Sequence, residues 1–162
     1  MILTVDHATA GDILDLEPNL RAEDRAELET ANNADAKKTL LEGYDRSIRR
    51  TSVRLHGRCV ALLGVVPDFR RDIGLPWLVA SPELVEQAPM EFCRRTKREG
   101  WVQDFASGFG LLANIVDSRN TLHVRWLQWA GFSFDQTPIH LNGVPFWRFY
   151  YDVFANRSGR GR

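Results

Sequence analysis

The sequence lacks an excess of charge of either sign, and it is poor in cysteine. Among its 162 residues are 21 basic and 21 acidic side chains, so the formal net charge is zero. A balanced chain has no overall electrostatic attraction to nucleic acid or to an anionic membrane, which argues against nucleic-acid binding as the main task. The two cysteines, Cys59 and Cys93, do not have the spacing of a disulfide framework or a metal site. We therefore expect both thiols to be reduced.

Long apolar runs are missing as well. No stretch approaches the roughly 18 apolar residues of a membrane helix, and the N-terminal residues do not resemble a secretory signal, so no membrane partner is expected. The length and a hydrophobic content of 44% suit one domain with a sizeable core. We expect that domain to span residues 1–155 and a disordered basic tail to span residues 156–162.

The hydrophobic pattern changes along the chain between the period of strands and the period of helices. The order of strand, helices, three strands, helix, strand, helix and strands indicates an α/β (α+β) fold with a mixed sheet. Turn signals stand at His56–Gly57 and Asn142–Gly143, and Pro18 and Pro89 interrupt two helical stretches. We expect strands at residues 1–6, 51–55, 58–66, 75–80, 111–116, 132–134 and 146–154, and helices at residues 8–31, 39–49 and 81–107. The inner face of the first helical stretch is expected to consist of Leu14, Leu16, Leu20 and Leu28.

A further helix is predicted in the amphipathic stretch NTLHVRWLQWAGF, residues 120–132. His123 and Leu127 flank its expected inner face, and Gly131 permits the left-handed turn that ends it. Two buried tryptophans on this face would contribute roughly 2–3 kcal/mol each. Packing therefore accounts for most of the stretch, and an active-site role is the alternative. Helical spacing places four side chains on the inner face: Leu122, Trp126, Trp129 and Ala130.

Asn120, Gly131 and Phe132 stand at the spacing of the late helix of the Gcn5-related N-acetyltransferase (GNAT) family, which the order of elements also resembles. The resemblance implies a mainly antiparallel central sheet flanked by helices. In that family a tyrosine on this helix often acts as the general acid, but here its position holds Leu127, which cannot donate a proton. The structural signature consists of Asn120, His123, Trp126, Trp129, Gly131 and Phe132.

Two longer stretches are similar to the internal virion protein A group of short-tailed bacteriophages. They are PWLVASPELVEQAP, residues 76–89, and LLANIVDSRNTLHVRWLQWAGF, residues 111–132, with a basic helix between them. The resemblance implies a protein packed inside the capsid near the portal, and thus located in the virion interior or the host cytoplasm. Its implied partners are other virion or phage structural proteins of the core or portal, within an oligomeric assembly.

The junction between the fourth strand and the following helix does not suit the cofactor of that enzyme family. GNAT enzymes bind a pyrophosphate there with a glycine-rich loop, whose backbone amides approach the phosphates. No glycine occurs between Gly74 and Gly100. Pro82 removes an amide donor, and Glu83 places a negative charge where a phosphate would lie. We therefore expect no cofactor, and acetyl-CoA only if the chain is an enzyme after all.

No other catalytic or metal-binding pattern is visible. The four histidines are far apart and lack metal-ligand spacing. Cys59 lies in an apolar strand, and Cys93 has no recognisable catalytic partner, although Arg94 and Arg95 would lower its pKa if it were exposed. No catalytic, cofactor-binding or metal-binding residue is assigned.

Two regions are candidate interaction surfaces. The segment PFWRFYYDVF, residues 145–154, has aromatics at consecutive positions, so a strand there presents them on both faces, with Trp147 and Tyr151 as expected anchors. The other region is a basic cluster, for which a solvated helix face is the alternative: Arg94, Arg95, Lys97 and Arg98.

Three hypotheses follow. The first is a non-catalytic GNAT-like phage protein, a virion component or assembly factor of the internal core and portal region that acts by protein–protein binding. The second is an active N-acyltransferase that uses acyl-CoA through an atypical loop. The third is a host-takeover protein that binds one bacterial target.

Overall fold

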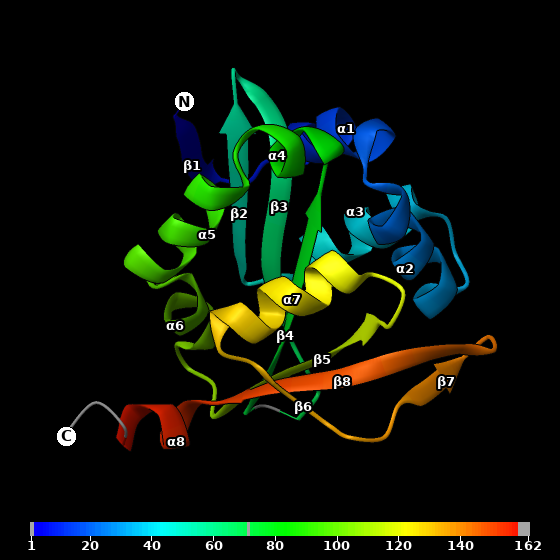
Figure 1. Ribbon diagram of the computed structural model, residues 1–162, viewed down its shortest axis with the longest axis vertical. Helices are drawn as coiled ribbons and strands as arrows, with labels where there is room; N and C mark the ends of the chain where they lie inside the picture. The colour runs from blue at the N-terminus through cyan, green and yellow to red at the C-terminus, as the bar shows by residue number, and fades with distance from the viewer. Residues whose placement is uncertain (1, 71, 159–162) are drawn as a thin grey trace.

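The computed structural model describes residues 2–70 and 72–158 and contains one eight-stranded sheet with helices on both faces (Figure 1). Its helices are α1 (Ala10–Leu16), the 3-10 helix η1 (Glu17–Asn19), α2 (Ala22–Asn32), α3 (Ala36–Arg46), α4 (Pro82–Gln87), α5 (Pro89–Arg98), α6 (Trp101–Ala106), α7 (Thr121–Ala130) and α8 (Val153–Ser158). Its strands are β1 (Leu3–His7), β2 (Arg49–Leu55), β3 (Arg58–Pro67), β4 (Ile73–Ala80), β5 (Leu111–Asp117), β6 (Ser133–Phe134), β7 (Ile139–Leu141) and β8 (Val144–Asp152).

The sheet is mixed but mainly antiparallel, which confirms the expected fold class. Its order is β1-β2-β3-β4-β5-β8-β6, and β7 pairs with β8. Among the described strands, β4 and β5 alone run parallel, and they pair only where Ile73 faces Leu111 and Gly74 faces Leu112. Beyond Gly74 the two strands separate, so the rest of β4 has no strand neighbour on the side of β5.

Two apolar cores lie on opposite faces of the sheet. The larger one joins the sheet to α4, α5, α6 and α7, with residues such as Leu112, Phe92 and Leu127 at its centre. The smaller one packs α1 and α3 on the other face through Ile13 and Leu40. Strand residues alternate between the two cores, as the two-residue period of a strand requires.

Local sequence signals explain most element boundaries. The β2–β3 turn has positive φ at His56 (51°) and Gly57 (77°), and the β7–β8 turn has the same pattern at Asn142 and Gly143, which confirms both predicted hairpin turns. The helix expected over residues 81–107 is three helices instead. Pro89 begins α5 because it lacks an amide to continue α4, and Gly100 adopts φ 66° before α6.

Two expectations about the ends of the chain require correction. Leu14 is 58% exposed and does not belong to the inner face of the first helical stretch, because α1 turns Ile13 toward the sheet beside the correctly predicted Leu16. Helix α8 extends to Ser158 and thus includes the first three residues of the expected disordered tail. Residues 159–162 lie outside the described part of the chain.

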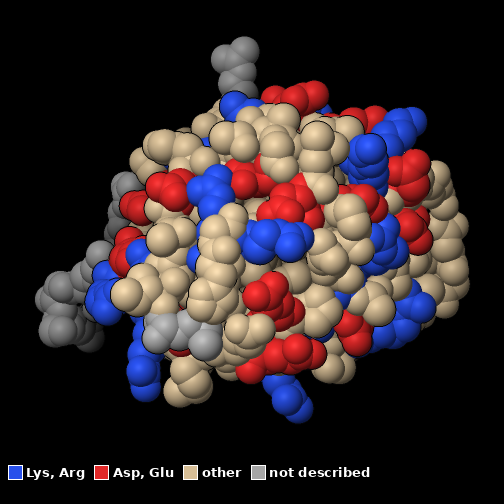
Figure 2. Space-filling model, turned by 90° about the horizontal axis from the view of Figure 1, so that it is seen from above, with Lys and Arg blue, Asp and Glu red and all other residues tan. Residues whose placement is uncertain are grey.

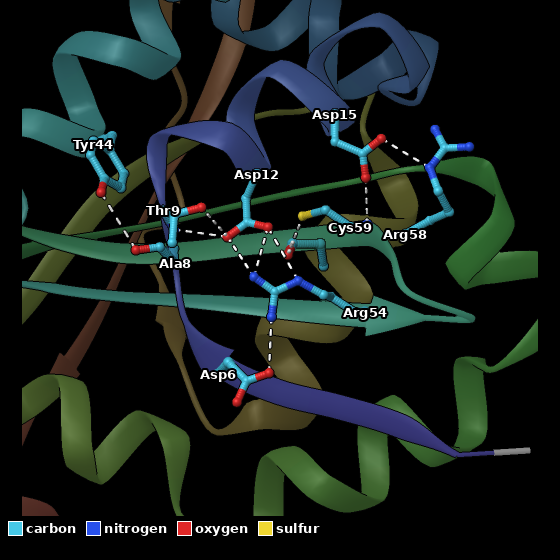
Figure 3. Close-up of polar contacts among 10 residues, drawn as sticks. Asp6, Ala8, Thr9, Asp12, Asp15, Tyr44, Arg54, Arg58 and Cys59 are labelled. Carbon is cyan, nitrogen blue, oxygen red and sulfur yellow. Dashed lines mark hydrogen bonds and ion pairs between the residues drawn. The ribbon is translucent and has the colours of Figure 1, made fainter.

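A buried polar cluster fastens α1 to the sheet (Figure 3). The guanidinium of Arg54 donates to both carboxylate oxygens of Asp12 at 2.8 Å and to Asp6 at 2.9 Å. The backbone N–H and the hydroxyl of Thr9 also donate to Asp12. Nearby, burial and the charge of Asp12 raise the pKa of the Cys59 thiol to about 12, so Cys59 is a core residue and not a nucleophile. We call Asp6, Thr9, Asp12 and Arg54 the Asp12 cluster.

The charges on the surface above this cluster are mixed. Figure 2 views the molecule from above Figure 1 and shows acidic and basic side chains interspersed over this face. No extended area of one sign is visible there, in agreement with the formal net charge of zero. This face therefore has no electrostatic preference for a polyanion.

Candidate functional site

The candidate site is the gap that opens where β4 separates from β5. In an antiparallel ladder, backbone groups alternate between pointing at the partner strand and pointing away from it. The backbone N–H and C=O of Ala80 form hydrogen bonds with residues outside β3, so they point away from that strand. Pro76 and Leu78 lie four and two residues before Ala80, so their backbone groups also point toward the gap. Helix α7 crosses in front of β4 (Figure 1) and brings the predicted signature residues to this place.

The edge of β4 that faces the gap is occupied by other residues of the chain. The N–H of Ala80 donates to Asp24 Oδ2 at 2.9 Å, and the carbonyl of Ala80 accepts from the N–H of Arg21 at 2.9 Å. The side chain of Asn114 donates to the carbonyl of Pro76 at 2.9 Å, and Pro76 has no N–H to offer. Two of the three residues that face the gap are thus closed to a ligand, and Leu78 is the third.

The group that closes the edge is itself a buried network. Asp24 is 3% exposed and accepts from Arg21 Nη1 at 3.0 Å and from Asn120 Nδ2 at 2.8 Å. Arg21 Nη1 also donates to Asn120 Oδ1 at 3.2 Å. Asn120, predicted as part of the signature, therefore joins the start of α7 to α2. We call Arg21, Asp24 and Asn120, with the backbone of Ala80, the Asp24 cluster.

Next to the Asp24 cluster, Glu27 and His123 face each other across a short gap. Oε1 of Glu27 accepts from the N–H of Asp117 at 2.8 Å, while Oε2 lies 3.6 Å from His123 Nδ1, too far for a hydrogen bond. Burial lowers the pKa of His123, but Glu27 and, more weakly, Asp24 outweigh it, so the pKa is raised above its ordinary value. His123 Nδ1 and Trp126 Nε1 are buried and have no hydrogen-bond partner among the described residues.

Two hollows meet at this point. One, of about 300 Å³, lies between α2, α3 and the separated strands. The other, of about 330 Å³, is a groove bounded by α4, α5 and α7, which we call the α5–α7 groove. Leu78 and His123 border both of them. The hollow between α2 and α3 includes Glu27, and the groove includes Arg21 and Asp24.

The β4–α4 junction does not fit a coenzyme A pyrophosphate. Ser81 is 3% exposed, and Pro82 is the first residue of α4, so the start of the helix lacks one of its amide donors. Glu83 adds a carboxylate to the first turn, where it opposes an anion. The structure therefore places these residues where the sequence predicted them, at the end of β4.

The inner face of α7 differs from the predicted one. The residues buried against the core are His123 and Leu127, whereas Leu122 is 38% and Trp129 is 39% exposed. Helix α7 is rotated so that Leu122 and Trp129 line the α5–α7 groove. Lys97 Nζ lies 4.2 Å from the centre of the Trp129 ring and partly covers it. Helical spacing alone could not distinguish these two rotations.

The structure divides the expected interaction surfaces. Arg94, Lys97 and Arg98 are exposed, but Arg95 is 19% exposed and donates to Glu99 at 2.7 Å and to the carbonyl of Leu3. Arg95 is therefore a structural residue. On β8, Tyr151 is 8% exposed and belongs to the core, and Trp147 is half-buried against it. Cys93 lies in the groove and is partly buried, and burial raises the pKa of its thiol. A lowering by its basic neighbours is expected only for an exposed thiol.

Two further absences hold for the described residues. No helix within residues 2–70 and 72–158 is long and apolar enough to cross a membrane. In the same ranges, no three histidine, cysteine or acidic side chains gather in a way that could hold a metal ion.

Arg21, Asp24 and Glu27 were not identified from the sequence, because an acidic amphipathic helix such as α2 looks like an ordinary solvated helix.

Comparison with solved structures places this arrangement in a known fold, although no family model and no curated protein matches the sequence. A GNAT-family acetyltransferase from Streptococcus pneumoniae is similar with 17% identity and a TM-score of 0.61, over 94% of this chain and 99% of that one. Spermidine N-acetyltransferase from Vibrio cholerae, in complex with CoA and spermine, is similar with 16% identity and a TM-score of 0.64, over 93% and 95%. The ribosomal-protein-S18-alanine N-acetyltransferase from Escherichia coli is similar with 13% identity and a TM-score of 0.63, over 94% of both chains. The chain thus has a GNAT-like fold.

Proposed function

We propose that this chain is a non-catalytic binding protein on a GNAT-like scaffold and that it does not use acetyl-CoA. The observation that carries the proposal is the closed edge of β4, where Asp24 and Arg21 occupy both backbone groups of Ala80. A thioester cofactor that entered the gap would have to break these bonds. Each buried polar group left unpaired costs about 1–3 kcal/mol.

The β4–α4 junction supports the same proposal by an independent route. The start of α4 provides a proline and a carboxylate, and neither can donate a hydrogen bond to a phosphate. The tyrosine that often serves as general acid in GNAT enzymes is replaced by Leu127, which lies 3% exposed in the core. Cofactor anchoring and proton donation are thus both without their usual residues.

We further propose that the protein belongs to a short-tailed phage, as a virion component or assembly factor of the internal core and portal region. The proposal rests on the resemblance of residues 76–89 and 111–132 to the internal virion protein A group, as given in the sequence analysis. The proposed partners are other virion or phage structural proteins, and the proposed location is the virion interior or the host cytoplasm. Protein–protein binding within an oligomeric assembly is the proposed activity.

A second candidate function is an N-acyltransferase that uses acyl-CoA. The observation that favours it is the meeting of two hollows at Leu78 and His123, because an acyl donor and an acceptor amine could approach each other from opposite sides. Glu27, 3.6 Å from His123, would give this meeting point an ionisable pair. The fold of the similar acetyltransferases is equally compatible with this candidate.

Isothermal titration with acetyl-CoA separates the two candidates. We expect no saturable heat at millimolar ligand, because the edge of β4 is closed and the junction lacks the amide donor of Pro82 and carries the carboxylate of Glu83. Saturable binding that is lost when Leu78 is enlarged to Trp would establish the gap as a cofactor site and would overturn the non-catalytic function. An acetyltransferase known to bind the cofactor serves as the positive control.

Mass spectrometry of purified virions tests the proposed location. A virion component is expected at a constant ratio to the portal protein. If the protein is absent from the particle but abundant in infected cells, the virion role is wrong, and a host-takeover function in the cytoplasm takes its place.

A further inference from the structure

We propose that the α5–α7 groove is the docking site for an acidic amphipathic helix of a partner protein. The inference rests on the proposed binding function and names the surface and the chemistry of the partner. Two properties of the groove carry it: an apolar floor and a basic rim.

The floor of the groove is apolar and open to solvent. It has a volume of about 330 Å³, enough for two or three aliphatic side chains. Phe92 and Trp126 form its base, with ring centroids 5.9 Å apart, while Leu122 and Trp129 remain 38% and 39% exposed. Two helices with an apolar furrow between them favour a third helix, whose anchors recur at helical spacing. The remaining apolar walls of the groove include Leu84 and Val85.

The rim of the groove is basic. Arg125 lines it, and Lys97 stands over the Trp129 ring. Both are exposed, and neither forms an ion pair with another residue in the described part of the chain. Unpaired cations around an apolar floor are complementary to a helix with leucine-like anchors and flanking carboxylates.

His123 and Trp126 also line the groove, but His123 Nδ1 and Trp126 Nε1 are themselves buried. His123 Nδ1 faces Glu27 Oε2 at 3.6 Å, on the side of α2. These atoms therefore belong to the interior of the protein, and the apolar floor and the basic rim define the docking site.

The same features disfavour nucleic acid. Stacking requires flat, accessible aromatic faces, but Lys97 partly covers Trp129, and Trp126 packs against Phe92 and the core. Asp24 also lines the groove and would repel a phosphate chain that ran along it. A protein segment, which can place its acidic side chains at Arg125 and Lys97 alone, avoids this repulsion.

Fluorescence anisotropy with a labelled helical peptide of about five turns tests the proposal. The probe has leucines at helical spacing and glutamates on the flanks, and the matched peptide has lysines in place of the glutamates. We expect saturable binding of the acidic peptide only. The double variant Lys97→Glu/Arg125→Glu and the variant Trp129→Ala should each weaken binding by about tenfold or more. The double variant Lys37→Glu/Lys38→Glu, an equal charge change at exposed sites on α3, should leave binding unchanged.

The outcomes are distinct. No binding of the acidic peptide, equal binding of the lysine peptide, or preferred binding of a single-stranded oligonucleotide overturns the docking proposal. So does a concentration-dependent dimer that Trp129→Ala abolishes, because the occupant would then be a second copy of this chain. Displacement of the peptide by acetyl-CoA would contradict the proposed function. If neither acetyl-CoA nor the peptide binds, the docking proposal fails alone. Circular dichroism of each variant confirms that it is folded.

Discussion

The protein has two buried carboxylate clusters with similar chemistry and different surroundings. In the Asp12 cluster, the carboxylate of Asp12, a residue that is 6% exposed, accepts hydrogen bonds from Arg54 and Thr9. In the Asp24 cluster, the carboxylate of Asp24, a residue that is 3% exposed, accepts hydrogen bonds from Arg21, Asn120 and the backbone N–H of Ala80.

The difference lies in what adjoins each cluster. The Asp12 cluster only joins α1 to β1 and β2. The Asp24 cluster lines a groove and adjoins His123, which faces Glu27. A buried ion pair by itself therefore indicates a helix that is held in place. A buried cluster that borders an open volume indicates a candidate site.

Arg54→Ala should have the largest effect. It leaves Asp12 buried without its cation, so we expect a loss of about 3–5 kcal/mol in the free energy of unfolding. Urea denaturation followed by circular dichroism measures it. The double variant Asp12→Ala/Arg54→Ala should lose less than Arg54→Ala alone, since no unpaired charge remains. Equal losses would show that the ion pair does not hold α1.

Asp24→Ala should have the next largest effect, about 2–3 kcal/mol. It leaves the N–H of Ala80 and the side chains of Arg21 and Asn120 without their shared acceptor. Asp24→Asn keeps one acceptor oxygen and is expected to recover part of the loss. Amide hydrogen exchange at Ala80 should accelerate in Asp24→Ala and not in Arg54→Ala, which separates the two clusters directly.

A pH dependence should distinguish the clusters further, because the buried side chain of His123 adjoins the second. The pKa of His123 is raised by the fold, so protonated His123 stabilises the protein fully below its ordinary pKa of 6.5. This contribution is lost as the pH rises through the higher pKa of the folded state, with a slope of at most about 1.4 kcal/mol per pH unit.

Urea denaturation between mildly acidic and mildly basic pH measures this contribution. The variant His123→Asn should lack the decline, and the wild type should show it. If both proteins lose the same stability above neutral pH, another group is responsible. The carboxylates that face His123 are Glu27 and Asp24, so Glu27→Gln should diminish the decline as well.

The two cysteines report on the two regions with the smallest perturbation. Cys59, whose thiol has a pKa of about 12, lies close enough to Asp12 for the carboxylate charge to raise that pKa. Cys93 lines the α5–α7 groove. Burial raises both thiol pKa values, so alkylation by iodoacetamide should be slow at neutral pH. Mass spectrometry should find Cys93 modified at least about tenfold faster than Cys59, because Cys93 is partly exposed. Faster modification of Cys59 would contradict the closed Asp12 cluster.

Much of the fold could be predicted because its signals are local. His56–Gly57, Asn142–Gly143 and Gly131 adopt the positive φ angles that their residue types favour. Pro89 and Pro82 begin helices for the same kind of reason. These positions depend on the backbone preferences of one or two residues and not on distant partners.

The site could be predicted only in part. The sequence indicated the unfavourable β4–α4 junction and the signature helix, since both are contiguous. It did not indicate Arg21 and Asp24. Their hydrogen bonds with Asn120 join residues that are 99 and 96 positions apart in the sequence. The sequence placed Trp126 and Ala130 correctly against the core, but it also assigned Trp129 to the inner face of α7. Trp129 is apolar by type but is exposed and partly covered by Lys97 from another helix. Such pairings depend on tertiary packing, which helical periodicity does not contain.

Amide NMR shifts of β4 during a titration with acetyl-CoA test the central claim most directly. If the chain itself closes the edge of β4, the amides of Leu78 and Ala80 should not move saturably at any millimolar concentration of the cofactor. Saturable shifts at these two amides and at Leu84 would show that the gap admits the cofactor, and the account given for this protein would be wrong.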